Sequence, residues 1–138
     1  MEKVKGYTDP IIDLLRKWGF IADESYTSWE AHKSGGILRY GPIPISFFKE
    51  KVVPMLADEN LQDAQNYGPS IQEVLDDDDF RAVAGYICSK DRSDERLTVE
   101  TVYIVENRDT IIGGWVRGGD EVWYDIIEGE NVIGVWYD

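Results

Sequence analysis

The sequence predicts a single α+β domain spanning residues 1–138, in which N-terminal helices and a short hairpin pack on a C-terminal antiparallel β-meander of about four to five strands. Before Phe80, apolar residues recur at helical spacing between capping signals. From Phe80 onward the period changes to two, and β-branched and aromatic residues are separated by turns. Helices followed by a run of strands are typical of this class, with the helices on one face of the sheet.

The first helix is predicted from the segment TDPIIDLLRKWGF. Thr8 is a candidate N-cap residue, and Pro10 falls in the first turn, where proline is tolerated. Apolar residues follow at helical spacing, at Ile11, Leu14, Leu15 and Trp18. Gly19 stands where a left-handed residue commonly ends a helix. We therefore expect an amphipathic helix that ends at Gly19.

A hairpin and two further helices are predicted between this helix and the strands. The paired glycines of residues 33–36 supply the positive φ of a tight turn between two short extended pieces. Ser46 is a candidate N-cap of the second helix, which Pro54 should kink or divide because proline lacks the N–H. Ser70 and Glu73 match the capping-box pattern at the start of a short third helix.

The strands of the meander are predicted at 80–90, 97–106, 110–117, 121–127 and 132–137. A turn centred on residues 129–130 places Trp123 opposite Trp136 in the closing hairpin. A turn at residues 118–119 places Trp123 also opposite Gly114. The sequence therefore predicts a large indole lying over a glycine.

Both faces of the last strands are largely apolar, although an antiparallel sheet with one wet face should alternate polar and apolar residues. Either both faces are covered, or one is an apolar patch for a partner. Trp123 and Trp136 are the best candidate anchors because large aromatic side chains dominate interface hot spots. They share a face with Asp125. The expected acidic rim consists of Asp120, Glu121, Asp125, Glu128, Glu130 and Asp138.

The chain carries 27 acidic and 14 basic residues, a formal net charge of −13. That balance disfavours direct binding to nucleic acid, because a phosphate backbone is held by basic side chains. Two explanations remain. The acidic surface either serves solubility or tolerance of salt, or it meets a basic macromolecular partner.

Four consecutive aspartates, Asp76, Asp77, Asp78 and Asp79, fall near the end of the predicted third helix. Negative charge there opposes the helix dipole, at a cost of up to about 1 kcal/mol. The run is either a solvated helix-to-strand junction, where aspartate favours turns, or an electrostatic contact with a basic partner. Calcium is not expected, because consecutive carboxylates lack the alternating ligands of an EF-hand loop.

Few residues offer catalytic or metal-binding chemistry. His32 is the only histidine, so no histidine pair can hold a metal. Cys88 is the only cysteine, and it can form neither an internal disulfide nor a thiolate metal site. In the segment SKDRSDERL, Arg92 and Arg96 are expected to pair with neighbouring acids. We therefore expect no catalytic, metal or cofactor site.

A single cysteine favours a reducing compartment, with the cytoplasm as the default. The N-terminal segment MEKVKGYTDP lacks the apolar core of a signal peptide. No later apolar run approaches the roughly 20 residues that span a bilayer. We therefore expect a cytoplasmic protein with no membrane partner.

The leading hypothesis is a non-catalytic acidic binding protein, of the inhibitor or immunity type, that masks a basic protein. Its expected partner-binding residues are Trp123, Trp136, Asp125, Asp76, Asp77, Asp78 and Asp79.

Two alternatives belong to other classes. The first is a small-molecule-binding or enzymatic fold with an aromatic pocket and an acid such as Glu30 or Asp125 at its base. The pocket would be lined by Trp18, Trp29, Tyr103 or Trp115. The second alternative is a homodimer that uses the apolar sheet face.

Overall fold

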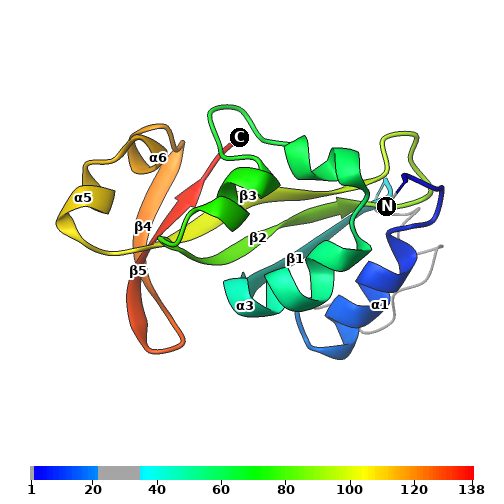
Figure 1. The fold of residues 1–138 in the computed structure, drawn as a ribbon, viewed down its shortest axis with the longest axis horizontal. Helices are drawn as coiled ribbons and strands as arrows, with labels where there is room; N and C mark the ends of the chain where they lie inside the picture. The colour runs from blue at the N-terminus through cyan, green and yellow to red at the C-terminus, as the bar shows by residue number, and fades with distance from the viewer. Residues whose placement is uncertain (1, 22–34) are drawn as a thin grey trace.

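The structure is a computed structural model that describes residues 2–21 and 35–138. Its elements are α1 (Asp9–Lys17), β1 (Ile37–Pro44), α3 (Ile45–Phe47), η1 (Phe48–Val52), η2 (Val53–Met55), η3 (Asp58–Gln62), α4 (Ile71–Asp76), β2 (Phe80–Cys88), β3 (Arg96–Val105), α5 (Arg108–Ile111), α6 (Gly114–Arg117), β4 (Glu121–Ile127) and β5 (Glu130–Trp136). The α+β class is confirmed: helices come before most of a five-stranded antiparallel sheet (Figure 1). No helix in the described ranges is long and apolar enough to cross a membrane.

The strands are arranged in the order β1-β2-β3-β5-β4, and every neighbouring pair is antiparallel. The predicted strand at 110–117 is wrong, because these residues form α5 and α6. A capping box explains the start of α5: Asn107 Oδ1 accepts from the N–H of Thr110 at 2.9 Å, and Thr110 Oγ1 accepts from the N–H of Asn107 at 3.0 Å. After β3 the chain runs through α5 and α6 to the outer edge of the sheet, where it forms β4. It then turns back, and β5 fills the position between β4 and β3.

The main core lies between the helices and one face of the sheet, as Figure 1 shows with the helical segments in front. It includes Ile11, Leu15, Phe48, Val52, Ile71, Val74, Val83, Val102 and Val135. A second, smaller cluster lies on the opposite face, where Ala82, Tyr103 and Val132 are buried beneath Trp123 and Ile127. Apolar side chains are therefore buried on both faces of the sheet.

The predicted end of α1 is confirmed. Gly19 has a φ of +79°, and its N–H donates to the carbonyl of Arg16 at 3.1 Å. The N–H of Phe20 donates to the carbonyl of Leu15 at 2.8 Å, which completes a Schellman motif. Thr8 occupies the N-cap position as expected, but its side chain does not cap the helix. Its hydroxyl instead donates to Glu95 Oε2 at 2.5 Å.

The segment that contains Pro54 is helical but irregular, since α3, η1 and η2 follow one another from Ile45 to Met55. A divided helix was expected from the proline, and this is what the structure has. Ser46 is not its cap: Pro44 holds the N-cap position, without a side-chain bond. The capping box of Ser70 and Glu73 is confirmed at the start of α4, by side-chain bonds of 3.1 and 3.0 Å to each other's backbone N–H.

Of the two extended pieces predicted around residues 33–36, the first lies outside the described residues. The second forms β1, which pairs with β2 from Ile37 opposite Cys88 to Pro44 opposite Ala82. Gly36 has the positive φ that the tight turn demanded. β1 thereby lies at one edge of the sheet.

The register predicted for the closing hairpin is wrong by two residues. Trp123 lies opposite Gly134, and Val122 lies opposite Val135. The turn residues are Glu128 and Gly129, with φ values of +49° and +80°, so the turn begins one residue earlier than expected. A shift of two keeps every side chain on its predicted face. The indole does lie over a glycine, but the glycine is Gly134, not Gly114.

Candidate interaction surface

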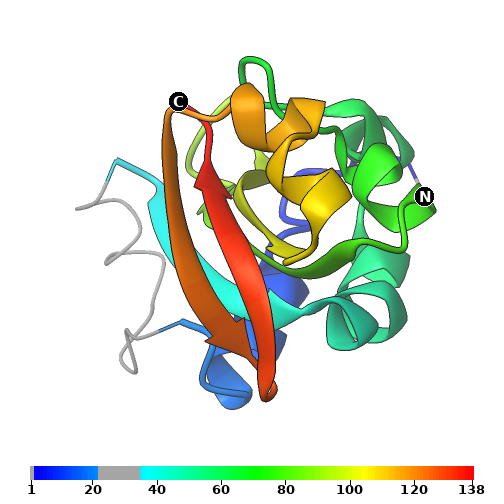
Figure 2. The same ribbon diagram turned by 90° about the vertical axis from the view of Figure 1, so that its left-hand side faces the viewer.

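Among the described strands, β4 lies at the outer edge of the sheet and pairs with β5 alone. Figure 2 looks onto this end of the molecule, with the β4–β5 hairpin in front. Along β4, Val122, Tyr124 and Ile126 point toward the helix-covered face, because Val122 pairs with the core residue Val135. The helices do not extend far enough to cover them, and their exposed fractions are 48%, 70% and 62%. We call these three residues the β4 apolar row.

The other face of β4 carries Glu121, Trp123, Asp125 and Ile127. Trp123 covers Gly134 so closely that a Cβ there would lie 2.3 Å from the indole Cε2. The indole also meets the ring of Tyr103 edge-on, with centroids 6.0 Å apart. Trp123 therefore has a packing role, and part of its surface remains exposed.

Asp125 is bonded by both of its carboxylate oxygens. Its Oδ2 accepts from Trp123 Nε1 at 3.3 Å, and its Oδ1 accepts from the backbone N–H of Ile126 at 2.8 Å. Burial, together with the negative charge of Asp125, raises the pKa of Tyr103. The carboxylate thus orients the indole and occupies a backbone donor of β4.

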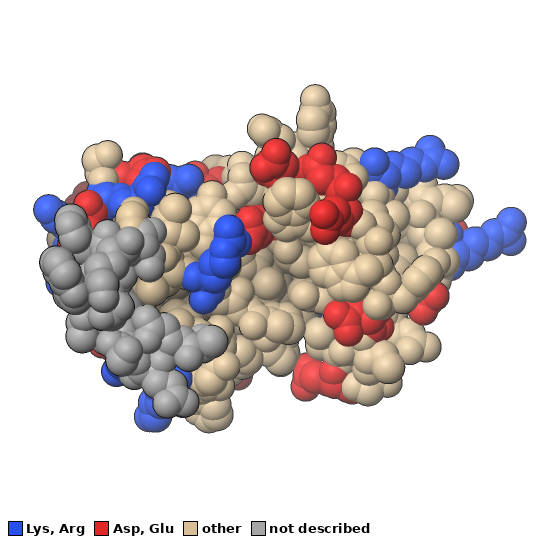
Figure 3. Space-filling view, turned by 180° about the vertical axis from the view of Figure 1, so that it is seen from behind, with Lys and Arg blue, Asp and Glu red and all other residues tan. Residues whose placement is uncertain are grey.

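Trp136 lies on the same face, opposite Thr101 of β3 and Glu121 of β4. It is half-buried, and it is a diagonal neighbour of Trp123 across the hairpin. The structure therefore brings together Trp123, Trp136 and Asp125. Figure 3 views this face from behind, where acidic side chains lie around uncharged surface in the half that carries β4 and β5.

The expected acidic rim has few internal counter-ions. Glu130 pairs with Arg81, whose Nε lies 2.7 Å from Glu130 Oε1. Asp120 Oδ2 accepts from the backbone N–H of Asp138 at 2.7 Å. Among the described residues, neither Glu121 nor Asp125 takes part in an ion pair. The negative charge along β4 is therefore not neutralised within the described part of the chain.

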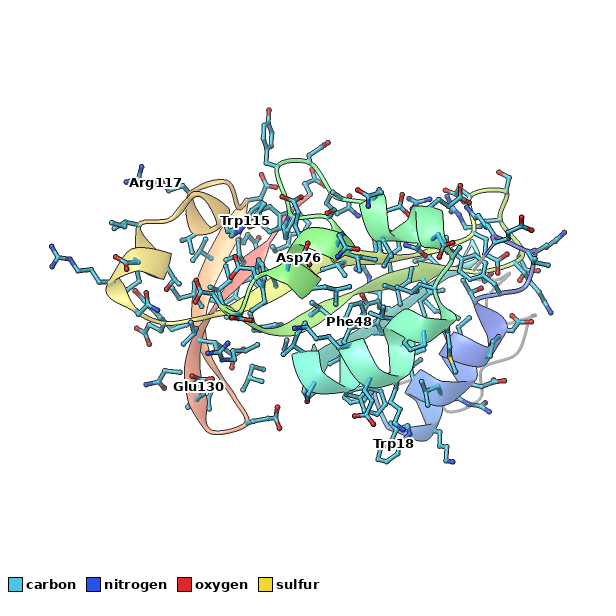
Figure 4. The ribbon with its side chains drawn as sticks, in the orientation of Figure 1. Trp18, Phe48, Asp76, Trp115, Arg117 and Glu130 are labelled. Carbon is cyan, nitrogen blue, oxygen red and sulfur yellow. The ribbon has the colours of Figure 1, made fainter. Side chains whose placement is uncertain are left out.

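Of the four aspartates, Asp76 lies on a different face of the molecule from the tryptophans. Asp76 ends α4, which packs on the helix-covered face through Ile71 and Val74, and Figure 4 shows Asp76 at the front of the molecule. The run forms the expected helix-to-strand junction: Asp77 Oδ1 accepts from the N–H of Asp79 at 2.9 Å. The side chains of Asp76, Asp78 and Asp79 are exposed and that of Asp77 is half-buried.

A shallow hollow of about 540 Å³ adjoins the β4 apolar row. It is lined by Glu106, Tyr124, Asp125, Ile126 and Asn131. Two of its five lining residues are acidic, and Tyr124 and Ile126 provide its apolar wall. From the sequence, the faces of residues 121–127 are expected either to be covered or to form an apolar patch. The pattern does not distinguish the β4 apolar row from the other apolar residues of the strand.

A second hollow, of about 440 Å³, lies near the opposite end of the sheet. Its polar groups bond to one another. Tyr7 Oη donates to Asn60 Oδ1 at 2.8 Å, and Asn60 Nδ2 donates to Asp63 Oδ2 at 3.2 Å and to the carbonyl of Leu97 at 2.7 Å. Burial is the main reason that the pKa values of Tyr7 and Asp63 are raised. These bonds tie the N-terminal segment and η3 to β3.

The charged loop that borders this hollow is salt-bridged, as expected. Asp94 pairs with Arg92 at 2.7 Å and with Arg96 at 2.9 Å. Hydrogen bonding from Arg92, and then from Arg96, holds the pKa of Asp94 well below its usual range, although burial opposes the shift. Arg92 and Arg96 are thus already paired with a carboxylate.

The residues of the expected aromatic pocket do not converge in the described part of the chain. Trp18 packs on Phe47, with ring centroids 5.5 Å apart. The ring centroids of Trp115 and Phe80 are 6.3 Å apart on the helix-covered side, whereas Tyr103 lies under Trp123 on the other face. Trp29, Glu30 and His32 fall outside the described residues.

Among the residues that the structure describes, we looked for side chains that could bind a metal ion and for a reactive thiol. No group of three histidine, cysteine, aspartate or glutamate side chains is placed to hold a metal ion there. Cys88 is buried, and burial raises the pKa of its thiol. A raised pKa makes a thiol a poorer nucleophile at neutral pH.

Comparisons of the chain with models of protein families, with curated proteins and with solved structures give no match.

Proposed function

We propose that the protein is a non-catalytic binding protein, of the inhibitor or immunity type, that masks a basic macromolecular partner through β4. The observation that carries this proposal is the β4 apolar row, three exposed apolar side chains on an edge strand that also carries two acids without ion pairs in the described chain. Exposed apolar residues that stand together beside a polar rim are typical of interaction sites.

The apolar row offers substantial binding energy. Its members, Val122, Tyr124 and Ile126, are about half to two-thirds exposed. Covering them completely is worth on the order of 3–5 kcal/mol, before the entropic cost of association is subtracted. Tyr124 is the most exposed of the three, and a tyrosine at the centre of a contact is a common hot spot.

Charge favours a basic partner over a second copy of the chain. Glu121 and Asp125 lie on β4 with no cationic partner in the described residues, and the whole chain carries −13. Two copies that met at this strand would bring like charges together, which opposes association. A basic protein would gain Coulomb attraction at the same place, and the attraction would weaken as salt is added.

The four aspartates support the same proposal from a distance. Asp76 lies at the end of α4 on the helix-covered side, and none of the four aspartates belongs to β4. Their charge would act through the field of the whole molecule and raise the association rate. We assign them a steering role, and we assign contact to β4.

The proposal is tested by capture and reconstitution. The wild-type chain and a triple variant, Val122→Thr, Tyr124→Thr and Ile126→Thr, are immobilised and exposed to a native lysate of the source organism at low and then high salt. Threonine keeps the β propensity of these positions and removes the apolar surface. Two control variants, Tyr67→Asn and Val4→Thr, remove side chains that are 86% and 64% exposed elsewhere.

The expected result is a basic protein that binds the wild type and both controls, is released by salt, and is lost from the triple variant. The captured protein is then purified and titrated against each variant, so that its affinity for each variant is measured directly. Equal binding to the triple variant, or no partner at either salt, contradicts the proposal. Light scattering at several protein concentrations identifies the homodimer alternative.

A further inference from the structure

We infer that the partner adds a strand to the free edge of β4, and that this strand alternates basic and apolar residues. The inference rests on the proposed function and names the mode of binding. It depends on three features of β4: the direction of its backbone groups, the contrast with the other edge of the sheet, and the distribution of side chains on its two faces.

The backbone groups that β4 leaves unpaired belong to its apolar row. Tyr137 donates its N–H to the carbonyl of Glu100, and Glu106 donates its N–H to the carbonyl of Asn131. The odd-numbered residues of β5 therefore face β3, and its even-numbered residues face β4. By the register of the hairpin, residues 121, 123, 125 and 127 bond to β5. Residues 122, 124 and 126 consequently direct their N–H and C=O groups away from the sheet.

The other edge strand, β1, carries devices that discourage strand addition. Pro42 and Pro44 lack the N–H that a new strand would need, and the register of β1 shifts between Tyr40 and Ile43. β4 has no proline and no lysine, and its seven pairs with β5 run without a shift. Edge strands are normally protected against pairing, so an edge strand with neither a proline nor a register shift, among the described strands, indicates a use for its edge.

The two faces of β4 specify the incoming side chains. An added strand places alternate residues beside Val122, Tyr124 and Ile126, where apolar side chains extend the row. Its other residues lie beside Glu121, Trp123 and Asp125. Basic side chains at the two acids form ion pairs, and an arginine between them can stack on the indole. The expected segment reads basic, apolar, basic, apolar, basic.

Asp125 protects this edge until the partner arrives. Its Oδ1 holds the N–H of Ile126, one of the three outward donors of the row. A lysine or arginine of the incoming strand would draw the carboxylate into an ion pair and leave that N–H for the new ladder. Binding would therefore replace one side-chain hydrogen bond by a backbone bond and an ion pair.

The inference is tested with peptides of defined sequence. The probe is an acetylated and amidated peptide with the core Lys-Val-Arg-Val-Lys between glycines. One control peptide carries glutamate in place of the three basic residues. The decisive control keeps every side chain and methylates alternate backbone nitrogens, which abolishes ladder bonds and leaves charge unchanged. Binding to the full chain is followed by nuclear magnetic resonance of the backbone amides.

The probe is expected to shift and protect the amides of Val122, Tyr124 and Ile126. The methylated peptide should bind about tenfold more weakly or worse, as the loss of one or two hydrogen bonds implies. Equal binding of probe and methylated peptide overturns strand addition, and so does saturation by the glutamate peptide. No binding of any peptide at millimolar concentration overturns it as well.

Failure of this inference is distinguishable from failure of the proposed function. If the captured basic protein depends on the apolar row but competes equally with both peptides, β4 is a docking face without an added strand. If the captured protein binds the triple variant as tightly as it binds the wild type, the proposed function itself fails. Light scattering could instead show a symmetric dimer in which the amides of residues 122–126 are protected without any peptide. The free edge of β4 would then pair with a second copy of the chain, and this result overturns the inference.

Discussion

Trp123 and Asp125, two residues apart on β4, share a hydrogen bond from the indole Nε1 to the carboxylate Oδ2 at 3.3 Å. The bond holds the indole over Gly134, and the second oxygen of Asp125 holds the N–H of Ile126. The carboxylate of Asp125 thus holds both the indole that packs on the hairpin and a backbone N–H at the free edge of β4. The two tryptophans anticipated as contact residues therefore lie beside the edge that we propose as the binding site.

The close approach of Trp123 to Gly134 predicts a large cost for any side chain at position 134. Gly134→Ala should destabilise the protein by about 1–3 kcal/mol, because a Cβ would lie 2.3 Å from the indole. Gly114→Ala is the matched control, since nothing lies within 4 Å of a Cβ there. Urea unfolding of both variants measures the difference.

A double variant separates overpacking from other causes. If the indole is responsible, Trp123→Ala should relieve most of the cost of Gly134→Ala, so that the two changes are far from additive. Additive destabilisation would mean that the glycine is required for another reason, such as its backbone conformation.

Glu95 supplies the N-terminal cap of α1 from a distant part of the chain. Its carboxylate accepts from the N–H groups of Gly6 and Thr8 at 2.8 and 3.1 Å and from the hydroxyl of Thr8. Glu95→Gln should cost about 1–3 kcal/mol, because a buried amide cannot accept all three bonds. Amide exchange of α1 should accelerate. Asp91→Asn, an exposed change in the same loop, should leave both readings unchanged.

Three buried tyrosines predict a loss of stability in alkali. Burial, the largest cause in each case, raises the pKa values of Tyr7, Tyr40 and Tyr137. The folded state therefore holds these protons more tightly than the unfolded chain. Their contribution is fully present below about pH 10, the ordinary value for tyrosine, and is lost as the pH rises toward the folded values.

Unfolding in urea at several pH values above and below 10 checks this prediction. Tyr137→Phe removes the hydroxyl that donates to the carbonyl of Trp115 at 2.5 Å. The variant should be about 1 kcal/mol less stable at neutral pH and should lose less stability in alkali than the wild type. An unchanged alkaline slope would exclude Tyr137 as a contributor.

The aspartate run is expected to affect the rate of association more than the lifetime of the complex. Changing Asp76, Asp77, Asp78 and Asp79 to asparagine should lower the association rate with a basic partner several-fold at low salt. The dissociation rate should change little, and the difference should shrink as salt is added. Kinetic binding measurements at two salt concentrations decide this. A large rise in the dissociation rate would place the run in the contact.

Local signals predicted several elements of the fold correctly. Gly19 ended α1 and the Ser70–Glu73 capping box began α4, because the bonds involved lie within a few residues of one another. The alternation of apolar residues located β2, β3, β4 and β5. Side chains of β2, β3 and β5 are buried in a core, whereas β4 contributes only Trp123 and Ile127, which are partly buried.

The order of the strands could not be read from the same pattern. Residues 110–117 alternate like a strand, but the capping box of Asn107 and Thr110 starts a helix there. The two residues have the N-cap and N3 spacing, and that spacing was the signal that could have identified α5. In the predicted meander, residues 121–127 would have been an inner strand. Their position at the edge, on which the proposed site depends, emerged only from the structure.

The hairpin register failed for a related reason. Glu128 adopts a positive φ, which non-glycine residues seldom do, so the sequence pointed to the turn one residue later. The candidate contact residues still shared a face, because the error was an even number of residues. The separation of Asp76 from the tryptophans could not have been predicted without the packing of α4.

The most direct test of the central claim is the affinity of the captured basic protein for the wild type and for the triple threonine variant of Val122, Tyr124 and Ile126, measured by titration at fixed salt. We expect the triple variant to bind about a hundredfold more weakly or worse, because some 3 kcal/mol of apolar contact is removed. We expect no change for Tyr67→Asn. An affinity for the triple variant equal to that of the wild type would contradict binding through the β4 apolar row.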